Sequence, residues 1–212
     1  MNKYLVEFIG TFFLVLTVYC CVVGLTGAGA AFAGLAIGSV LMVMIFAGGH
    51  VSGAHYNPAV TLAVFMRGKI GIGDVPGYII AQLLGGVAAA LVGKLLIGGP
   101  AEIAIAKPFM PALLAEFLGT FALCYVVLHV ATAKANAGNH FYGLAIGFTV
   151  TAMAYALGGI SGGAFNPAVA AGAIIGGLSN VADIAMFLIG HITAGALAAI
   201  VFRITSPDDF ND

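Results

Sequence analysis

Charge is the scarcest property of this 212-residue sequence. Only 7% of its residues are charged and 62% are hydrophobic, whereas a soluble globular domain carries about 25% charged residues. The net charge is −1, without a basic patch, and this argues against nucleic acid as a partner. Most of the molecular surface is therefore expected to face a lipid bilayer.

Tryptophan is absent and cysteine is rare. Tyr, Lys and Arg are left to anchor the protein at the membrane interface. Cys20, Cys21 and Cys124 lack a metal-ligand spacing, so we interpret them as small apolar packing residues and predict neither a metal site nor a cofactor. Glu7 interrupts the apolar N-terminal segment, and no small-residue cleavage site follows it. This segment is predicted to be a membrane span and not a signal peptide.

Long hydrophobic runs divide the rest of the chain. Six segments can cross about 30 Å of hydrocarbon, at about 3–25, 32–49, 77–98, 111–133, 141–158 and 182–203. Two shorter apolar segments, at about 57–67 and 166–176, would reach only about half that depth as helices. The predicted fold class is an all-α membrane protein with six transmembrane helices and two re-entrant half-helices.

An internal repeat relates the two halves of the chain. EFIGTF at 7–12 returns as EFLGTF at 116–121, GLAIG at 34–38 returns at 143–147, and NPAV at 57–60 returns at 166–169. Each pair is separated by 109 residues, as are Gln82 and His191. We divide the single domain 1–212 into half-repeats of about 1–105 and 106–212. Because each half has three spans, the repeat is expected to be inverted, with the solute path at its interface.

The repeated tripeptides are suited to start helices inside the membrane. They are Asn57, Pro58, Ala59 and Asn166, Pro167, Ala168. Asn is a preferred N-cap and Pro suits the first helical position. A lone tripeptide of this kind is better explained as an ordinary helix start. A matched pair places two positive helix ends at the midplane, which oppose cations and hydronium. The Asn amides can hold a passing water by its oxygen and so interrupt a proton wire.

Gly-rich and Ser-rich segments precede both tripeptides, at 50–56 and 159–165. We expect them to be extended and to line a water-filled cavity, where their carbonyl groups accept hydrogen bonds. The candidate pore-loop residues are His50, Ser52, Gly53, Ser161 and Gly162. His50 and His55 are too few for a metal site, which favours pore-lining or loop-packing roles, with a response of His50 to pH left open.

Two carboxylates, Glu7 and Glu116, lie in predicted spans. Such residues serve either in proton relays or as acceptors for loop N–H groups. Each one precedes its own Asn-Pro-Ala by the same number of residues, and this favours the structural role. His191, in the sixth span, is expected to make an interhelical hydrogen bond, with a regulatory role left open.

With these motifs in place, the sequence resembles the aquaporin, or major intrinsic protein, family over nearly its whole length. The most specific match is GHVSGAHYNPAVT at 49–61, and Glu7 and Glu116, each followed by Gly-Thr-Phe, match the paired glutamates of that family. The resemblance implies an aquaporin-like fold in a lipid bilayer, a pore in every protomer and a homotetramer.

The chain departs from the family after the second tripeptide. The usual Arg is replaced by Val169, and by motif spacing the other filter positions fall on Ile37, Ala154 and Gly163. Replacing Arg removes five N–H donors and a fixed cation. We expect a wide filter that passes water together with glycerol, urea or ammonia, or alternatively an apolar constriction that impedes water by dewetting. Ala170 stands where glycerol facilitators usually have Asp, so the resemblance to that branch is incomplete.

The predicted function is a passive channel for water and small uncharged solutes that excludes ions and protons, and not an enzyme. An energised transporter would need more intramembrane carboxylates than the two matched glutamates. A non-conducting or junctional protein of the same fold is the alternative. Five basic residues on one side against two on the other favour cytoplasmic termini, and short loops favour a prokaryotic inner membrane. The five are Lys3, Arg67, Lys69, Lys134 and Arg203, and the two are Lys94 and Lys107.

Overall fold

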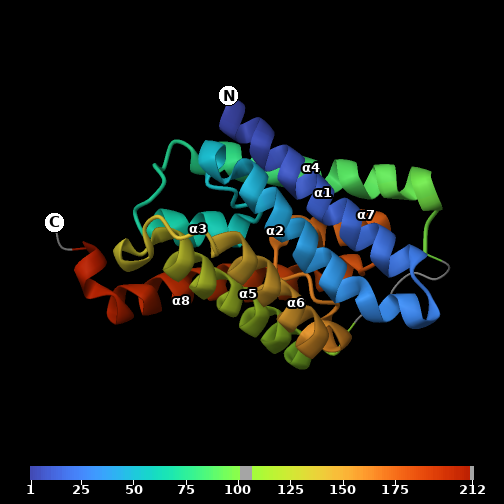
Figure 1. Ribbon diagram of the computed structural model, residues 1–212. Helices are drawn as coiled ribbons and strands as arrows, with labels where there is room; N and C mark the ends of the chain where they lie inside the picture. Colours follow the sequence, from blue (N-terminus) through green and yellow to red (C-terminus); the bar gives the residue numbers. More distant parts are fainter. Residues whose placement is uncertain (101–106, 211–212) are drawn as a thin grey trace.

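The computed structural model describes residues 1–100 and 107–210, and this part of the chain is all-helical (Figure 1). Its six long helices are α1 (Asn2–Gly24), α2 (Ala33–Ser52), α4 (Val75–Ile97), α5 (Phe109–Thr132), α6 (Tyr142–Ser161) and α8 (Ile184–Thr205). Two short helices are α3 (Pro58–Met66) and α7 (Pro167–Gly176). Single 3₁₀ segments lie at Gly27–Phe32 (η1), Lys134–Asn136 (η2), Val181–Asp183 (η3) and Pro207–Phe210 (η4).

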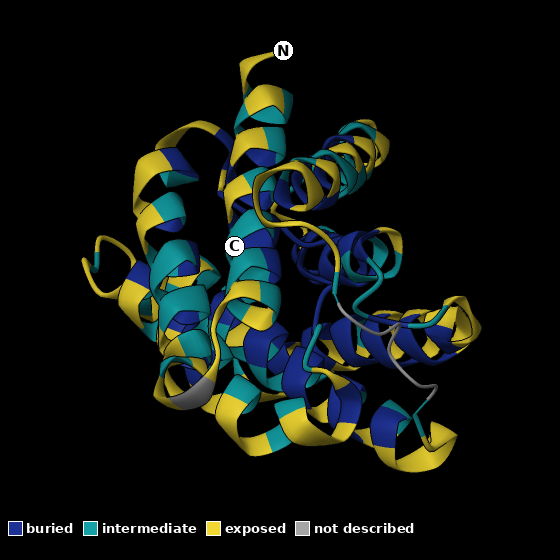
Figure 2. Ribbon diagram, turned by 90° about the vertical axis from the view of Figure 1, so that its right-hand side faces the viewer, coloured by how far each residue is buried: buried dark blue, intermediate teal, exposed yellow. Residues whose placement is uncertain are grey.

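All six long helices are long and apolar enough to cross a membrane, which confirms the predicted spans. Helices α2 and α6 each run three residues further than expected, to Ser52 and Ser161. Buried positions lie on the inner sides of the helices and exposed positions on the outside of the bundle (Figure 2). Leu84 and Leu188 are among the large apolar side chains that are exposed. The chain is therefore an integral membrane protein. The predicted boundary between the half-repeats falls within 101–106, outside the described residues.

The long helices pack in the same way in both halves. Helix α1 packs against α2 and α4, and α5 packs against α6 and α8. The halves meet where α2 crosses α6 at Gly38 and Gly147, and a Cβ on either glycine would collide with the backbone oxygen of the other. Small residues at such a crossing let two backbones approach closely.

Each half-helix packs more extensively on a long helix of the other half than on any long helix of its own half. Helix α7 lies against α4, where a Cβ on Gly86 would be 2.5 Å from the Ala168 oxygen. Helix α3 lies against α8, where a Cβ on Gly195 would be 2.7 Å from the Ala59 oxygen. The two Asn-Pro-Ala segments are therefore held at the interface between the repeats.

Arg67 contacts several elements at one end of the bundle. Arg67, after α3, donates to the Thr132 oxygen at the end of α5 at 3.3 Å and lies 3.6 Å from Asp209. Its guanidinium also stacks on Phe202 and Phe210, at 5.0 and 4.6 Å from the ring centroids. These contacts tie the first half-helix to the C-terminal segment.

Candidate functional site

Both short helices begin with a side-chain cap on an extended residue. Asn57 has φ −156° and its Oδ1 accepts from the Ala59 N–H at 2.9 Å. Asn166 has φ −162° and its Oδ1 accepts from the Ala168 N–H at 2.8 Å. A proline follows each asparagine at the start of the helix. The amide oxygens are thus committed to the helices, and the amide nitrogens are turned elsewhere.

The two asparagine amides brace each other's loops. Asn57 Nδ2 donates to the Phe165 carbonyl oxygen at 3.0 Å, and Asn166 Nδ2 donates to the Tyr56 carbonyl oxygen at 2.8 Å. Tyr56 and Phe165 are the residues directly before the two asparagines. Each amide has a second N–H, for which the described residues supply no acceptor. Both side chains border the same cavity, so this second donor is available to a solute.

The loops before the asparagines are shorter than expected. Helices α2 and α6 continue through Ser52 and Ser161, so 50–52 and 159–161 are helical and not extended. The helices end because Gly53 and Gly162 adopt positive φ, at 82° and 97°. A glycine in this conformation directly after the last turn is a common way to end a helix.

Three residues without the freedom of glycine are also held at positive φ in these loops. They are Ala54 at 52°, Tyr56 at 51° and Phe165 at 49°. Backbone of this kind is costly for side chains with a Cβ and persists only where surrounding contacts impose it. Glu7 and Glu116 bind the N–H groups of Tyr56 and Phe165, and the Ser52 hydroxyl binds that of Ala54.

The first loop is held by Glu7, which is fully buried in α1. Its carboxylate accepts four hydrogen bonds, from Ser52 Oγ (2.7 Å), His55 N (2.9 Å), Tyr56 N (2.7 Å) and Gln82 Nε2 (2.7 Å). Every donor comes from the first half of the chain. Four donors on one carboxylate account for the burial of the charge without a cation beside it.

The second loop is held by Glu116 of α5, which is also fully buried. It accepts from Ala164 N at 3.0 Å and Phe165 N at 2.7 Å, and His191 Nε2 of α8 donates to it at 2.7 Å. His191 therefore makes the interhelical hydrogen bond expected of it. Both glutamates bind loop N–H groups, as a structural acceptor would.

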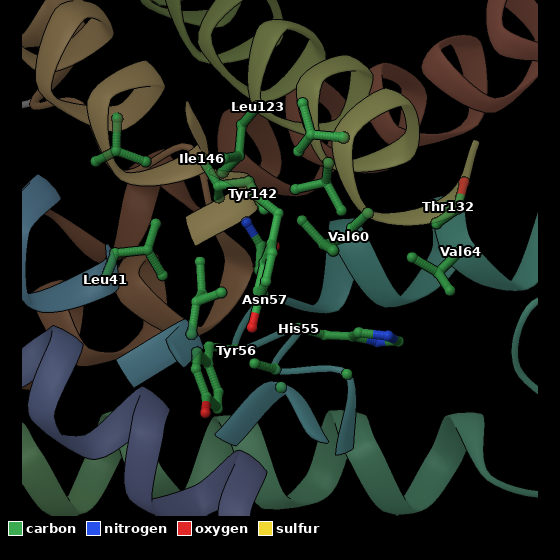
Figure 3. Close-up of a pocket in the computed structure, with 18 of the residues that line it drawn as sticks. Leu41, His55, Tyr56, Asn57, Val60, Val64, Leu123, Thr132, Tyr142 and Ile146 are labelled. Atoms are coloured by element: carbon green, nitrogen blue, oxygen red, sulfur yellow. The ribbon is translucent and has the colours of Figure 1, made fainter. Parts of the chain in front are cut away.

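The cavity at the repeat interface has a volume of about 800 Å³. Figure 3 shows Leu41, Val60, Leu123 and Ile146 around Asn57. Apolar walls with a few polar groups at fixed points are typical of sites for small neutral molecules. The wall is formed by both halves, since α2, α3, α5 and α6 all contribute to it.

The predicted filter residues lie at different places relative to this cavity. Ile37, Gly163 and Val169 border it, and Ala154 is not among the described residues that line it. On α6, the lining residues Tyr142, Ile146 and Val150 recur every fourth position, and Ala154 continues that series. Among the predicted pore-loop residues, His50, Ser52 and Gly53 border the cavity, whereas Ser161 and Gly162 do not.

Several residues near the site were not predicted from the sequence. Thr61 receives a hydrogen bond from Gln82 at 3.0 Å and lies 3.1 Å from His55 Nδ1. Val60, which the 109-residue spacing matches to Val169, also borders the cavity. The spacing itself was the signal that could have identified both Val60 and the pairing of Gln82 with Glu7.

Within residues 1–100 and 107–210, no group of three or more His, Cys, Asp or Glu side chains is placed to hold a metal ion. The polar groups that border the cavity include the two asparagines, His50, His55 and Lys69.

Comparisons with known proteins agree over most of the chain. The family model Major intrinsic protein matches residues 1–202. Aquaporin NIP1-3 of Oryza sativa subsp. japonica is 40% identical over 176 residues, covering 79% of this chain and 61% of that protein. Glycerol uptake facilitator protein-like 6 of Lactiplantibacillus plantarum is 36% identical over 176 residues, covering 79% and 81%.

The fold also matches a solved structure, the aquaglyceroporin from Plasmodium falciparum. The TM-score is 0.77 at 23% sequence identity, and the match covers 99% of this chain and 98% of the other. The chain spans less than two thirds of the length of the first curated relatives that it matches, at 61%, 56% and 64%.

Proposed function

The chain belongs to the major intrinsic protein family, and from that premise we propose that it is a passive channel for water and small uncharged solutes. It excludes ions and protons and catalyses no reaction. The observation that carries this proposal is the convergence of Asn57 and Asn166, from opposite halves of the chain, on one cavity.

The paired asparagines supply the mechanism of exclusion. Each has one N–H fixed on the opposite loop and a second that can donate to a solute oxygen. A water held by its oxygen between these donors turns its hydrogens away from the centre of the pore, which disfavours proton transfer along a chain of waters. The positive ends of α3 and α7 raise the potential at the same point, so a cation is repelled and a neutral molecule is not.

The solute range is set by the outer filter, for which we propose Ile37, Ala154, Gly163 and Val169. None of these side chains carries a hydrogen-bond donor. Val169 leaves more room than Arg would and offers a solute no side-chain partner. A filter of this kind supports passage of molecules the size of glycerol or urea, and the Lactiplantibacillus relative is named as a glycerol uptake facilitator.

Stopped-flow light scattering on proteoliposomes tests this function. The protein should conduct water, glycerol and urea well above bare lipid. Val169→Arg should reduce glycerol flux more than water flux, and Val169→Leu, which adds bulk without charge, serves as its control. Water flux equal to bare lipid would overturn the channel, and intact protein without flux would favour the non-conducting alternative. A wild-type pore that passes water alone would overturn the wide filter.

We also propose that the protein is a homotetramer with both termini in the cytoplasm of a prokaryotic cell. The grouping of Arg67, Lys134 and Arg203 around the C-terminal segment supports this orientation, because basic residues favour the cytoplasmic side. Cross-linking in native membranes and labelling of single cysteines from either side of the membrane test the two statements.

A further inference from the structure

Two matched glycines, Gly53 and Gly162, are covered by different side chains. They end α2 and α6 and are separated by the repeat spacing. A Cβ on Gly53 would lie 3.3 Å from His55 Nε2. A Cβ on Gly162 would lie 3.2 Å from Lys107 Nζ. The same place on the two loops is thus taken by an imidazole in the first half and by an ammonium group in the second.

The replacement follows from the sequence of the second loop. The residue that matches His55 is Ala164, whose methyl group cannot reach Gly162. Lys107 reaches it from the segment before α5. The lysine is half-buried, and no described residue pairs with it in a salt bridge or accepts a hydrogen bond from it. Among the described residues, this ammonium group beside a pore loop therefore keeps N–H donors without an acceptor.

Lys107 lies next to one of the proposed filter positions. His55, which occupies the equivalent place in the first half, borders the cavity. Gly163, which follows the glycine that Lys107 covers, borders the cavity and is one of the proposed filter positions. Lys107 does not itself border the cavity, but by the inverted repeat it stands at the second pore loop as His55 stands at the first, beside the glycine that precedes Gly163. Unlike a neutral imidazole, a lysine brings a compact positive charge.

We propose that Lys107 is a specificity-determining residue that supplies a fixed positive charge to the outer filter. In this filter Val169 stands in place of the usual Arg. This inference rests on the proposed channel function. A positive charge here repels cations small enough to enter a filter without Arg. The alternative is a purely structural role, in which the ammonium complements the C-terminal end of α6.

Urea and guanidinium distinguish these roles, because they are similar in size and shape and differ by one charge. The measured quantity is the guanidinium-to-urea permeability ratio in proteoliposomes. Lys107→Met should raise the ratio about tenfold or more, since like charges within several ångströms of each other repel strongly near a protein surface. Lys107→Arg should leave it within about twofold, because it keeps the charge. The matched control is Lys94→Met, because this outer lysine donates to the Ile175 oxygen at 2.8 Å.

If Lys107→Met does not fold, Lys107→Gln replaces it. A measurement on the wild-type protein also tests whether the charge of Lys107 acts on the permeating ion. Raising the ionic strength from about 0.01 M to about 1 M shortens the screening length from about 30 Å to about 3 Å, so the wild-type ratio should rise. An unchanged ratio, in the variants or at high salt, would overturn the inference. A lower melting temperature at a constant ratio would assign Lys107 to helix capping. Wild-type protein without urea flux would overturn the channel itself, whatever the lysine does.

Discussion

The two pore loops have similar backbones and are held by different chemistry. In the first, Glu7 accepts from four donors, and Gln82 extends the network to Thr61 and His55. In the second, Glu116 accepts from two loop N–H groups and from His191, while alanines stand at the positions of His55 and Thr61. The repeat has thus kept the residues that set the backbone and varied those that support it. The first loop therefore has additional side-chain contacts, through Thr61 and His55, that the second lacks.

Replacing each glutamate by Gln should show the largest difference between the halves. Each oxygen of Glu7 accepts two hydrogen bonds, and an amide with its nitrogen at Oε1 leaves the buried His55 N–H unpaired, whereas the Ser52 hydroxyl can rotate to accept from that nitrogen. At Glu116, an amide can place its nitrogen where Ala164 N is the donor and keep the oxygen for Phe165 and His191. At about 1–3 kcal/mol for a donor left unpaired, Glu7→Gln should cost about 3 kcal/mol because His55 N is buried, and Glu116→Gln about 1 kcal/mol because Ala164 N is only partly buried.

The yield of folded protein and its melting temperature in mild detergent measure this difference. Equal losses in the two variants would contradict the ranking of the two networks. Normal yield combined with altered transport would instead return the glutamates to a proton-relay role.

Replacing matched glycines by Ala should have a smaller effect of the same sign. A Cβ on Gly10 would collide with the ring of Tyr56, and a Cβ on Gly119 would collide with the ring of Phe165. The Tyr56 hydroxyl also donates to the Met44 oxygen at 2.9 Å, so this ring is the less able to move. We expect Gly10→Ala to cost about 2 kcal/mol and Gly119→Ala about 1 kcal/mol, within the range for overpacking a core.

Thermal unfolding of the two glycine variants measures these costs. Gly158→Ala is the control, because a Cβ at that position would meet no atom within 4 Å. A larger loss of stability for Gly119→Ala than for Gly10→Ala would show that the hydrogen bond from the Tyr56 hydroxyl to Met44 does not restrain the ring.

Exchanging the residues that brace the glutamates should have the smallest effect. Gln82 Nε2 donates to both Glu7 and Thr61, whereas an imidazole Nε2 has a single hydrogen to donate. Gln82→His should therefore cost about 1 kcal/mol, the value of one hydrogen bond. His191→Gln keeps the bond to Glu116 and should cost about 0.5 kcal/mol or less. Melting temperatures of the two variants test this order, and a larger loss for His191→Gln would show that the imidazole does more than donate one hydrogen bond.

Much of the fold was predictable because it rests on local and periodic features. Six long apolar runs and two short ones correspond to the eight α-helices found in the described part of the chain. The expected extended loops were wrong for 50–52 and 159–161, because Gly53 and Gly162 end their helices later than Gly-rich composition suggested. Ala154 and Lys107 show why the sequence alone did not define the whole site. Whether a side chain borders the cavity or a neighbouring loop depends on the path of the backbone, which motif spacing does not describe.

By itself the sequence predicted an inverted repeat and identified the two helix starts and the pairing of each glutamate with its loop. These depend on residue types at a constant spacing of 109 and on the preferences of Asn, Pro and Gly for helix ends. Only the tertiary structure decided that each asparagine amide is fixed by the loop of the other half. It also decided that Lys107 covers the glycine that His55 covers in the first half. These contacts join residues far apart in the chain, and they form only when the two halves pack against each other.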